Sequence, residues 1–238
     1  MLNNSKIEWT ESTWNPITGC TKVSEGCTNC YAEKMSKRLH NMNNIRYIHS
    51  FNVTIHEDLI NQPLNQKKSK MIFVCSMSDL FHEDVPDEII IKIFETMNKA
   101  NWHTFQVLTK RSERLLEISE KLIFSDNIWM GVTIENTDNL YRMNNLMKIK
   151  ANTKFISFEP LLGIIPQGIN LVGIDWAIVG GESGPKSRPI EENWVITIRD
   201  ICERDNVSFF FKQWGGVNKK KNGRLLQGEI YNQFPKSK

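Results

Sequence analysis

The sequence lacks a long apolar run, an apolar leader and a strong excess of charge of either sign. No apolar stretch approaches the roughly 20 residues that cross a bilayer, which excludes a helical membrane protein. Residues 1–9 contain no apolar signal core, so we expect a cytoplasmic protein. The 30 lysine and arginine residues are nearly matched by 27 aspartate and glutamate residues, a balance that does not by itself indicate a nucleic-acid-binding protein.

Cysteine is also scarce, with five residues in 238. An odd number of cysteines in a chain without an export signal argues against a disulfide framework. Cys75 and Cys202 stand alone in apolar surroundings, which predicts buried thiols. The other three cysteines, Cys20, Cys27 and Cys30, lie close together with the spacing C-x6-C-x2-C.

This cysteine triplet has three interpretations. Three thiolates on one short loop can bind three irons of a [4Fe–4S] cluster and leave the fourth iron open, because a fully bound cluster takes four cysteines. A structural zinc site prefers four ligands from paired C-x2-C knuckles, and a distant His40, His82 or Cys75 would have to complete it. The third interpretation is free thiols. Gly19 and Gly26, each directly before a cysteine, favour a bound group because glycine lets the backbone wrap closely around a ligand.

Short apolar runs alternate with amphipathic stretches after residue 70. The runs are continuous, as expected for strands covered on both faces. The predicted strands are Met71–Cys75, Phe105–Leu108, Ile128–Val132, Lys154–Phe158, Trp176–Val179 and Ser208–Phe211. The predicted helices are Glu88–Ala100, Ser112–Glu120, Thr137–Lys148 and Glu191–Arg204. This alternation predicts right-handed crossovers and a largely parallel sheet.

The amino-terminal part is less regular. Trp14–Thr18 is predicted as the first strand, Tyr31–Asn41 as a helix and Phe51–Ile55 as an extended segment. With 238 residues and 40% hydrophobic content the chain can form one substantial core. We therefore expect an α/β fold, a single-domain parallel β/α barrel over residues 1–238 that is partial or irregular. The cysteine loop occupies residues 14–33, and a polar tail begins at about residue 215 and wraps the outside or is partly mobile.

Parallel β/α proteins place their sites at the carboxyl ends of the strands. Each predicted strand is followed there by hydroxyl, carboxylate, amide or cationic side chains, which predicts a ligand site along this rim. The candidates are Ser76, Ser78, Asp79, Thr109, Lys110, Arg111, Thr133, Glu135, Asn136, Glu159, Glu182 and Lys212.

Several of these features also have an ordinary structural interpretation. Lys110 and Arg111 can bind a carboxylate or phosphate, or simply begin a helix. The glycines of Gly180–Gly184 can let a ligand approach or form a tight turn, and they lack the Rossmann spacing. We interpret residues 82–84 as acidic helix caps. Three tryptophans near the rim, Trp9, Trp14 and Trp214, can stack a base, although core packing is the commoner use.

Segments from nearly the whole chain resemble a known group, the phage-associated three-cysteine-motif proteins, which are radical S-adenosylmethionine (SAM)-like. The matching segments are Thr13–Cys20 (TWNPITGC), Gly26–Glu33 (GCTNCYAE), Ser76–Phe81 (SMSDLF), Leu108–Arg111 (LTKR), Gly131–Asn136 (GVTIEN), Ser157–Leu162 (SFEPLL), Gly180–Gly184 (GGESG) and Phe211–Gly215 (FKQWG).

The resemblance implies a radical SAM-like TIM-type barrel with a [4Fe–4S] cluster and SAM as cofactors. Cys20, Cys27 and Cys30 would bind three irons, and the fourth iron would chelate the amino and carboxylate groups of SAM. One electron, from a donor of the flavodoxin or ferredoxin type, would cleave the sulfonium and give a 5′-deoxyadenosyl radical that abstracts hydrogen from a substrate.

The resemblance also implies roles along the rim. Most radical SAM proteins use C-x3-C-x2-C and carry Gly-Gly-Glu after the second strand, where this chain has Ser76–Asp79. We therefore expect Ser76, Ser78 or Asp79 at the methionine amino group. Lys110 or Arg111 would hold the SAM carboxylate, and Thr133, Glu135 and Asn136 would meet the ribose or adenine. Thr109 is a further candidate for cofactor binding. Glu159, Glu182 and Lys212 are candidates for substrate contact and catalysis.

The substrate stays open. A nucleotide or nucleic-acid base is compatible with the mildly basic tail Lys219–Lys221 and Arg224, and small molecules or peptides are equally compatible. Two other classes remain, a zinc-stabilised nucleic-acid-binding module and a non-catalytic iron–sulfur partner protein.

Overall fold

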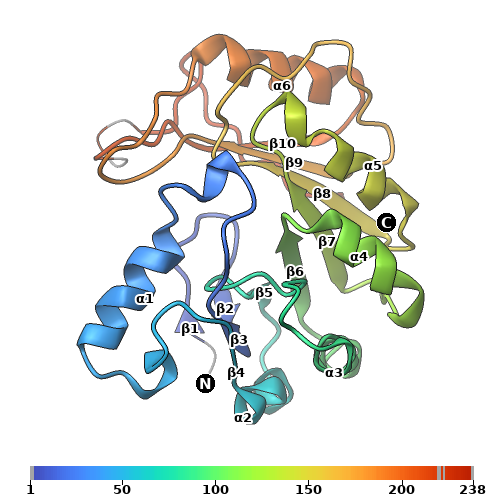
Figure 1. Cartoon of the computed structure of the whole chain (residues 1–238). Helices are drawn as coiled ribbons and strands as arrows, with labels where there is room; N and C mark the ends of the chain where they lie inside the picture. The colour runs from blue at the N-terminus through green and yellow to red at the C-terminus, as the bar shows by residue number, and fades with distance from the viewer. Residues whose placement is uncertain (1–2, 219–220, 222, 237–238) are drawn as a thin grey trace.

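A curled sheet of eight strands organises the molecule, seen in a computed structural model that describes residues 3–218, 221 and 223–236 (Figure 1). The strand order is β1 (Asn3–Asn4), β2 (Ser12–Trp14), β5 (Met71–Val74), β6 (Thr104–Thr109), β7 (Ile128–Thr133), β8 (Thr153–Phe158), β9 (Trp176–Gly180) and β10 (Ser208–Gln213). Only β1 pairs antiparallel within this sheet, and β2 to β10 form seven parallel strands. The expected partial parallel β/α barrel is confirmed as an α/β half-barrel. The expectation of one domain over residues 1–238 stays a prediction.

Most of the helices cover one face of this sheet. The α-helices are α1 (Tyr31–Asn41), α2 (Glu57–Ile60), α3 (Asp87–Lys99), α4 (Ser112–Ile118), α5 (Tyr141–Lys148) and α6 (Glu192–Arg204). Short 3-10 helices are η1 (Glu25–Cys27), η2 (Ile45–Tyr47), η3 (Gln62–Asn65), η4 (Ser119–Lys121) and η5 (Thr137–Asn139). Helix α3 buries Ile90, Ile93, Phe94 and Met97, whose helical spacing makes one apolar stripe. In Figure 1, α3, α4 and α5 lie on one side of the sheet and α1 lies on the other.

The first strand differs from its prediction. The segment Trp14–Thr18 is not one strand, because β2 ends at Trp14 and a separate strand, β3 (Ile17–Thr18), pairs antiparallel with β4 (Thr54–Ile55). Pro16 lies at the break, and proline has no N–H to continue a strand ladder. The change of direction turns the chain from the sheet into the cysteine loop.

An aromatic cluster fills the concave side of the half-barrel. Trp9, Phe73, Phe155, Trp176 and Phe210 are buried together, and the Trp9 and Phe73 ring centroids are 4.8 Å apart. Their strand members come from the amino-terminal or middle part of each strand. The carboxyl ends of the strands are therefore left for a site, as the rim prediction requires.

The carboxyl-terminal tail closes the free edge of the sheet. Tyr231 and Gln233 hydrogen-bond to β10 (Phe211 N to Tyr231 O, 3.1 Å; Gln233 N to Phe209 O, 3.2 Å). The tail thus covers the row of unpaired backbone groups that an edge strand would otherwise expose. The predicted wrapping is confirmed for its described part, while Lys219 and Lys220 lie outside the described residues.

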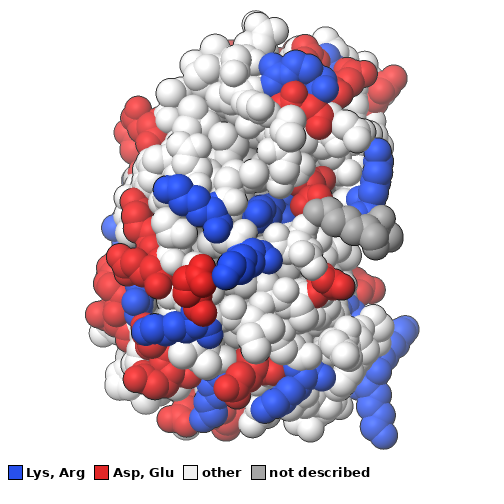
Figure 2. Space-filling model, turned by 90° about the vertical axis from the view of Figure 1, so that its right-hand side faces the viewer, with Lys and Arg blue, Asp and Glu red and all other residues white. Residues whose placement is uncertain are grey.

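Figure 2 shows one broad face of the molecule, with basic and acidic side chains interspersed. This agrees with the near balance of charge in the sequence. Among the described residues, no helix combines the length and the apolar character that a membrane crossing needs.

Candidate functional site

The part of the cysteine loop that carries the three cysteines, residues 20–30, lies across the carboxyl ends of the parallel strands. Side chains that follow β6, β7 and β9 contact it directly. Cys20, Cys27 and Cys30 are free and partly exposed on this loop, whereas Cys75 and Cys202 are buried as predicted. The loop and the polar strand ends therefore form one connected site.

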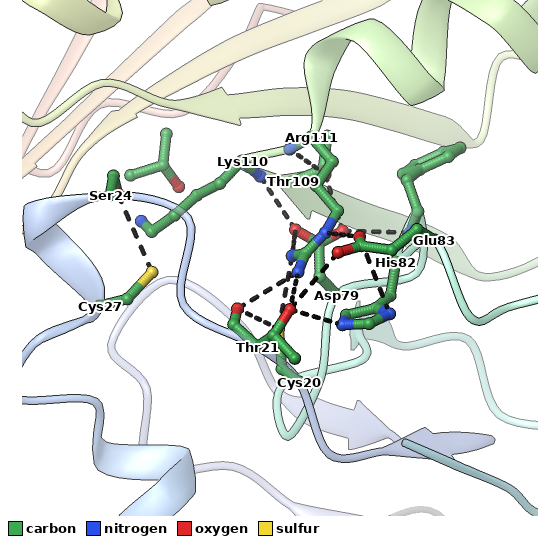
Figure 3. Close-up of polar contacts among 12 residues, drawn as sticks. Cys20, Thr21, Ser24, Cys27, Asp79, His82, Glu83, Thr109, Lys110 and Arg111 are labelled. Carbon is green, nitrogen blue, oxygen red and sulfur yellow. Dashed lines mark hydrogen bonds and ion pairs between the residues drawn. The ribbon is translucent and has the colours of Figure 1, made fainter. Parts of the chain in front are cut away.

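Arg111, at the end of β6, fixes the first cysteine (Figure 3). Its Nη1 lies 3.4 Å from Cys20 Sγ, and its Nη2 donates to Thr21 Oγ1 at 2.9 Å. Its Nε donates to Glu83 at 2.7 Å, and Nη1 also lies 3.4 Å from Asp79 Oδ2. Burial, and then the Asp79 carboxylate, raise the pKa of the Cys20 thiol to about 11, although Arg111 lowers it. Binding of a metal by Cys20 would therefore release a proton.

His82 and Glu83 belong to the same network. Buried His82 hydrogen-bonds through Nε2 to Thr21 Oγ1 at 2.8 Å, and Glu83 pairs with Arg111. Helix α3 begins only at Asp87, without a side-chain cap. The interpretation of these two residues as helix caps was wrong, because their partners come from distant loops.

Asp79, which follows β5, connects this strand end to the end of β6. Its Oδ1 accepts from Thr109 Oγ1 at 2.7 Å, and its Oδ2 accepts from Lys110 N at 3.0 Å and from Arg111. The side chain is buried, with 7% exposure of the residue. Both carboxylate oxygens are already engaged within the chain, so Asp79 fixes the turn after β6.

Two serines tie the end of β5 to the preceding segment. Ser76 Oγ donates to Asn15 Oδ1 at 3.1 Å, and Ser78 Oγ donates to Ile17 O at 2.9 Å. The Tyr31 hydroxyl donates to the Ser76 carbonyl and brings the start of α1 to the same place. The sequence-predicted group Ser76, Ser78 and Asp79 is therefore assembled at one strand end.

A buried ionic cluster centres on Glu135, which is fully buried after β7. Its carboxylate accepts from Ser24 Oγ at 2.5 Å and Arg142 Nη1 at 2.7 Å, and lies 3.1 Å from Lys110 Nζ. Burial favours a raised pKa for Glu135, but the Lys110 and Arg142 cations outweigh it and lower the pKa. Arg142 also donates to the Thr133 carbonyl at 2.8 Å. This cluster binds the middle of the cysteine loop to β7.

Two of the predicted contacts lie apart from the loop. The Thr133 side chain is buried within β7, and Asn136 caps η5 by accepting from Asp138 N at 3.1 Å. Among the described residues, neither side chain makes a hydrogen bond to residues 20–30. Their assignment to ribose or adenine stays a prediction.

Glu182, which follows β9, contacts the cysteine loop at a third point. It accepts from Asn29 Nδ2 at 2.9 Å and from Arg188 Nη2 at 2.7 Å. Arg188 Nη2 in turn donates to the Glu25 carbonyl at 2.9 Å. Burial favours a raised pKa for Glu182, yet its hydrogen bonds to Arg188 and Asn29 lower the pKa. Both residues therefore stay charged and clamp the loop.

Glu159 and Lys212 form an ion pair between the carboxyl ends of β8 and β10. Lys212 Nζ lies 2.7 Å and 3.0 Å from the two Glu159 carboxylate oxygens. Lys212 lies where the register of β10 against β9 shifts, between Phe211 and Gln213. Between them runs Gly180 of β9, where a side chain would crowd the Glu159 carboxylate at 3.3 Å. Both remain candidates for substrate contact.

The three tryptophans divide as core and rim. Trp9 and Trp14 are buried in the core at 3% and 0% exposure, so they are not available to stack a ligand. Trp214 lines a hollow of about 300 Å³ together with Arg188, Pro189 and Ile190. Trp214 alone keeps the predicted position beside the site.

The three cysteines offer a donor set that an iron–sulfur cluster can use. Between residues 3 and 236, the described side chains include no cluster of three or more His, Cys, Asp or Glu that could hold one metal ion. A structural zinc site, which takes four ligands, stays an alternative. An iron–sulfur cluster spreads its thiolates over separate irons, and three accessible free thiols on one anchored loop fit that donor set.

Glycines beside the cysteines have another function than the predicted one. A Cβ at Gly19 would lie 2.1 Å from the Asn52 carbonyl oxygen, and φ there is +85°. A Cβ at Gly26 would lie 2.5 Å from Glu135 Oε1. These glycines let the loop pack against the protein itself, so they no longer count in favour of a bound group.

Several loop-holding residues were not predicted from the sequence. They are Thr21, Ser24, Asn29, Arg142 and Arg188. One signal was present, because the residues between the cysteines are nearly all polar and carry hydroxyl and amide groups. Their partners are 90 to 153 positions away for the bonds to Arg111, Glu135 and Glu182, and no local pattern reveals such pairs.

A family model described as "Protein of unknown function (DUF5131)" matches residues 4–235. The chain belongs to the DUF5131 family. A comparison with curated proteins finds no match.

Solved structures of spore photoproduct lyase, a radical SAM enzyme, resemble this DUF5131 member in fold. The lyase in complex with a dinucleoside spore photoproduct has a TM-score of 0.53 at 11% identity, covering 89% of this chain and 78% of the lyase chain. A variant of the lyase in which one cysteine is replaced by alanine, with the same ligand, has a TM-score of 0.57 at 11% identity, covering 89% of this chain and 78% of the lyase chain. A doubly substituted variant with bound AdoMet and the dinucleoside gives 0.53 at 10% identity over 90% and 79%. At these identities the likeness concerns the fold.

Proposed function

We propose that this chain is a radical SAM enzyme that holds a [4Fe–4S] cluster through Cys20, Cys27 and Cys30 and acts on a nucleotide or nucleic-acid base. One observation carries the proposal. Three free, accessible thiols lie on a loop that is anchored across the carboxyl ends of a parallel half-barrel. The fold likeness to spore photoproduct lyase supports it. The phage association suggested by the motifs stays a prediction.

The chain's own residues supply the surroundings of the cluster. Two cations, Arg111 and Lys110, lie near Cys20 and suit a carboxylate. Both already pair with carboxylates of the chain, Arg111 with Glu83 and Lys110 with Glu135, so a bound carboxylate would share them. The Ser76 and Ser78 end of β5 lies on the same rim. When bound and reduced, the cluster would supply the electron that cleaves SAM and starts hydrogen abstraction from the substrate. The protein's part is to orient both molecules and to exclude water.

A nucleotide substrate is supported by two features. Trp214 and Arg188 line the hollow beside the cysteine loop and offer an aromatic ring and a cation. The carboxyl ends of β8 and β10 also hold the Glu159–Lys212 pair, a carboxylate and an ammonium next to one another. The spore photoproduct lyase structures contain a dinucleoside ligand. We infer that a base stacks on Trp214.

The function is tested by anaerobic reconstitution with iron and sulfide, followed by dithionite and SAM. We expect 5′-deoxyadenosine in the products, measured by liquid chromatography and mass spectrometry. Cys27→Ala should abolish cluster uptake, whereas Cys202→Ala, in the core, should keep it. Normal iron uptake by Cys27→Ala contradicts the ligand assignment, a brown but inert protein indicates a scaffold, and zinc without iron indicates a binding module.

The substrate class is tested in the same assay. Addition of dinucleotides or single-stranded DNA should raise 5′-deoxyadenosine formation. Trp214→Ala should lower that stimulation about tenfold, because one base-stacking contact is lost. Stimulation that is equal in the variant rejects the stacking site. Stimulation by peptides alone rejects the substrate class.

A further inference from the structure

Helix α1 and η2 form a feature that we call the α1–η2 arm, residues 31–48. Of the eleven residues of α1, only Ala32 and Ser36 are buried. Large apolar side chains stand exposed along the arm, namely Met35 at 43%, Met42 at 65%, Ile45 at 79% and Ile48 at 57%. In Figure 1 the arm projects on the side of the sheet opposite to α3, α4 and α5. Four exposed large apolar side chains between residues 35 and 48 make this segment a candidate interaction site.

The arm is also positively charged. Residues 31–48 contain four lysines and arginines against one glutamate, Glu33. Glu33 already pairs with Lys37 at 2.6 Å, and Arg46 pairs with Asp58 outside the arm. Lys34 and Arg38 are exposed one helical turn apart. A partner with an acidic surface therefore complements the arm.

The apolar part of the arm favours a protein over a nucleic acid. Methionine and arginine are enriched in protein interfaces, and methionine adapts to a partner's shape. Interfaces with DNA are more polar and more strongly basic than this one. Four large aliphatic side chains beside a few cations fit an acidic protein.

The position of the arm indicates which acidic protein. Cys30 is the N-cap of α1, so the arm continues directly from the third cysteine. Met35 lies five residues further, about 8 Å along the helix axis. A protein seated on the arm is thus adjacent to the metal-binding loop.

We propose that the α1–η2 arm is the docking surface of the acidic, flavodoxin-type protein that supplies the electron; this inference rests on the proposed function. In the step it serves, one electron passes from the reduced flavin of the donor to the iron–sulfur cluster. The donor is oxidised by one electron, and no group is transferred.

Binding tests the docking surface without any turnover. Isothermal titration calorimetry of the full-length protein with an acidic flavodoxin should show binding that weakens as salt rises. The double variant Lys34→Glu, Arg38→Glu should bind at least about tenfold more weakly, because two charges are reversed against an acidic partner. The control Lys148→Glu, Lys150→Glu changes the charge equally at and just after the end of α5 and should bind as the wild type does. Equal binding by the arm variant, or no binding by the wild type, overturns the proposal, as does tight binding of a DNA duplex through the same two cations.

A second readout separates this proposal from the proposed function. With dithionite as reductant, the arm variant should form 5′-deoxyadenosine at the wild-type rate. With reduced flavodoxin, its rate should fall about tenfold. If the wild type forms no 5′-deoxyadenosine but the arm-dependent flavodoxin binding persists, the proposed function fails and the docking surface stands. If both reductants serve the variant equally well, the docking surface fails alone.

Discussion

At the scale of single residues, the site depends on ionic groups that are buried and mutually satisfied. Glu135 and Arg142 are almost entirely removed from solvent, at 0% and 1% side-chain exposure, and their atoms lie 2.7 Å apart. A buried pair contributes little net stability, but removal of one partner leaves an uncompensated charge. Glu135 and Arg142 therefore hold the loop in position. Removal of either one should lower the free energy of unfolding, because the other charge would stay buried without a partner.

Replacement of Glu135 by glutamine should expose that cost. The Arg142 charge would lose its carboxylate, and we expect a loss of about 3–5 kcal/mol in the free energy of unfolding. The matched control is Glu120→Gln, whose partner Lys150 is exposed and 3.1 Å away. That control should change stability by less than about 0.5 kcal/mol. Urea titration measures both, and equal effects of the two substitutions would contradict the account.

The same carboxylate gives a direction in pH. The folded-state pKa of Glu135 is lowered, so its ionised form stabilises the fold above the unfolded-state pKa of about 4.3. This contribution disappears as the pH falls from there through the lower folded-state pKa. Urea titrations at about pH 6 and about pH 3.5 should show a smaller pH-dependent loss in Glu135→Gln than in the wild type. An identical loss would mean that Glu135 is not ionised in the fold.

Thiol reactivity separates the two groups of cysteines. Cys75 and Cys202 are buried and therefore shielded from a reagent, whereas the three loop thiols are partly exposed. Burial raises the pKa of Cys75 and of Cys202 to about 12 and that of Cys20 to about 11, so exposure rather than the pKa separates the two groups. We expect Ellman's reagent to modify only the three loop cysteines in the native apoprotein and all five in denaturant. Rapid reaction of Cys202 in the native protein, located by peptide mass spectrometry, would contradict its place in the core.

At the scale of elements, the cysteine loop is defined by where its backbone must pass. Gly19 and Gly228 share a φ of +85°, but only Gly19 has backbone within reach of an added Cβ, with the Asn52 oxygen at 2.1 Å. Gly228 has nothing within 4 Å. The two positions therefore separate backbone strain from steric exclusion.

Alanine substitutions at these two glycines should differ. Gly228→Ala carries only the left-handed backbone penalty, about 1–2 kcal/mol. Gly19→Ala must also displace the loop, and we expect a loss of about 3 kcal/mol or more together with reduced iron uptake. Thermal unfolding and iron analysis measure the effects. A Gly19→Ala protein as stable as Gly228→Ala would show that the loop does not pack against residue 52.

Elements with a strong periodic pattern could be predicted from the sequence. Helix α1 has the predicted bounds, and α3 differs by one residue at each end. The prediction of one strand over Trp14–Thr18 was wrong because it followed the apolar residues and ignored Pro16, which interrupts a strand. Contacts between residues far apart in the sequence could not be predicted for another reason. Asn29 meets Glu182, and Thr21 meets His82, only once the sheet has brought their loops together.

At the scale of the whole molecule, the two ends of the half-barrel have different tasks. An aromatic cluster fills the concave side toward the amino ends of the strands, and the carboxyl ends carry the anchored cysteine loop. The α/β class and the partial barrel followed from the alternation of apolar runs and amphipathic helices. Which rim residues face a ligand did not follow, because most of them are engaged in holding the loop.

The central claim is a metal centre with one coordination position that the chain leaves open. The most direct measurement is electron paramagnetic resonance of the oxygen-free, dithionite-reduced protein with and without SAM. The account predicts a [4Fe–4S]⁺ signal that changes shape when SAM is added and that is absent in Cys27→Ala. A signal that SAM leaves unchanged, or a protein that takes up no iron, would contradict it.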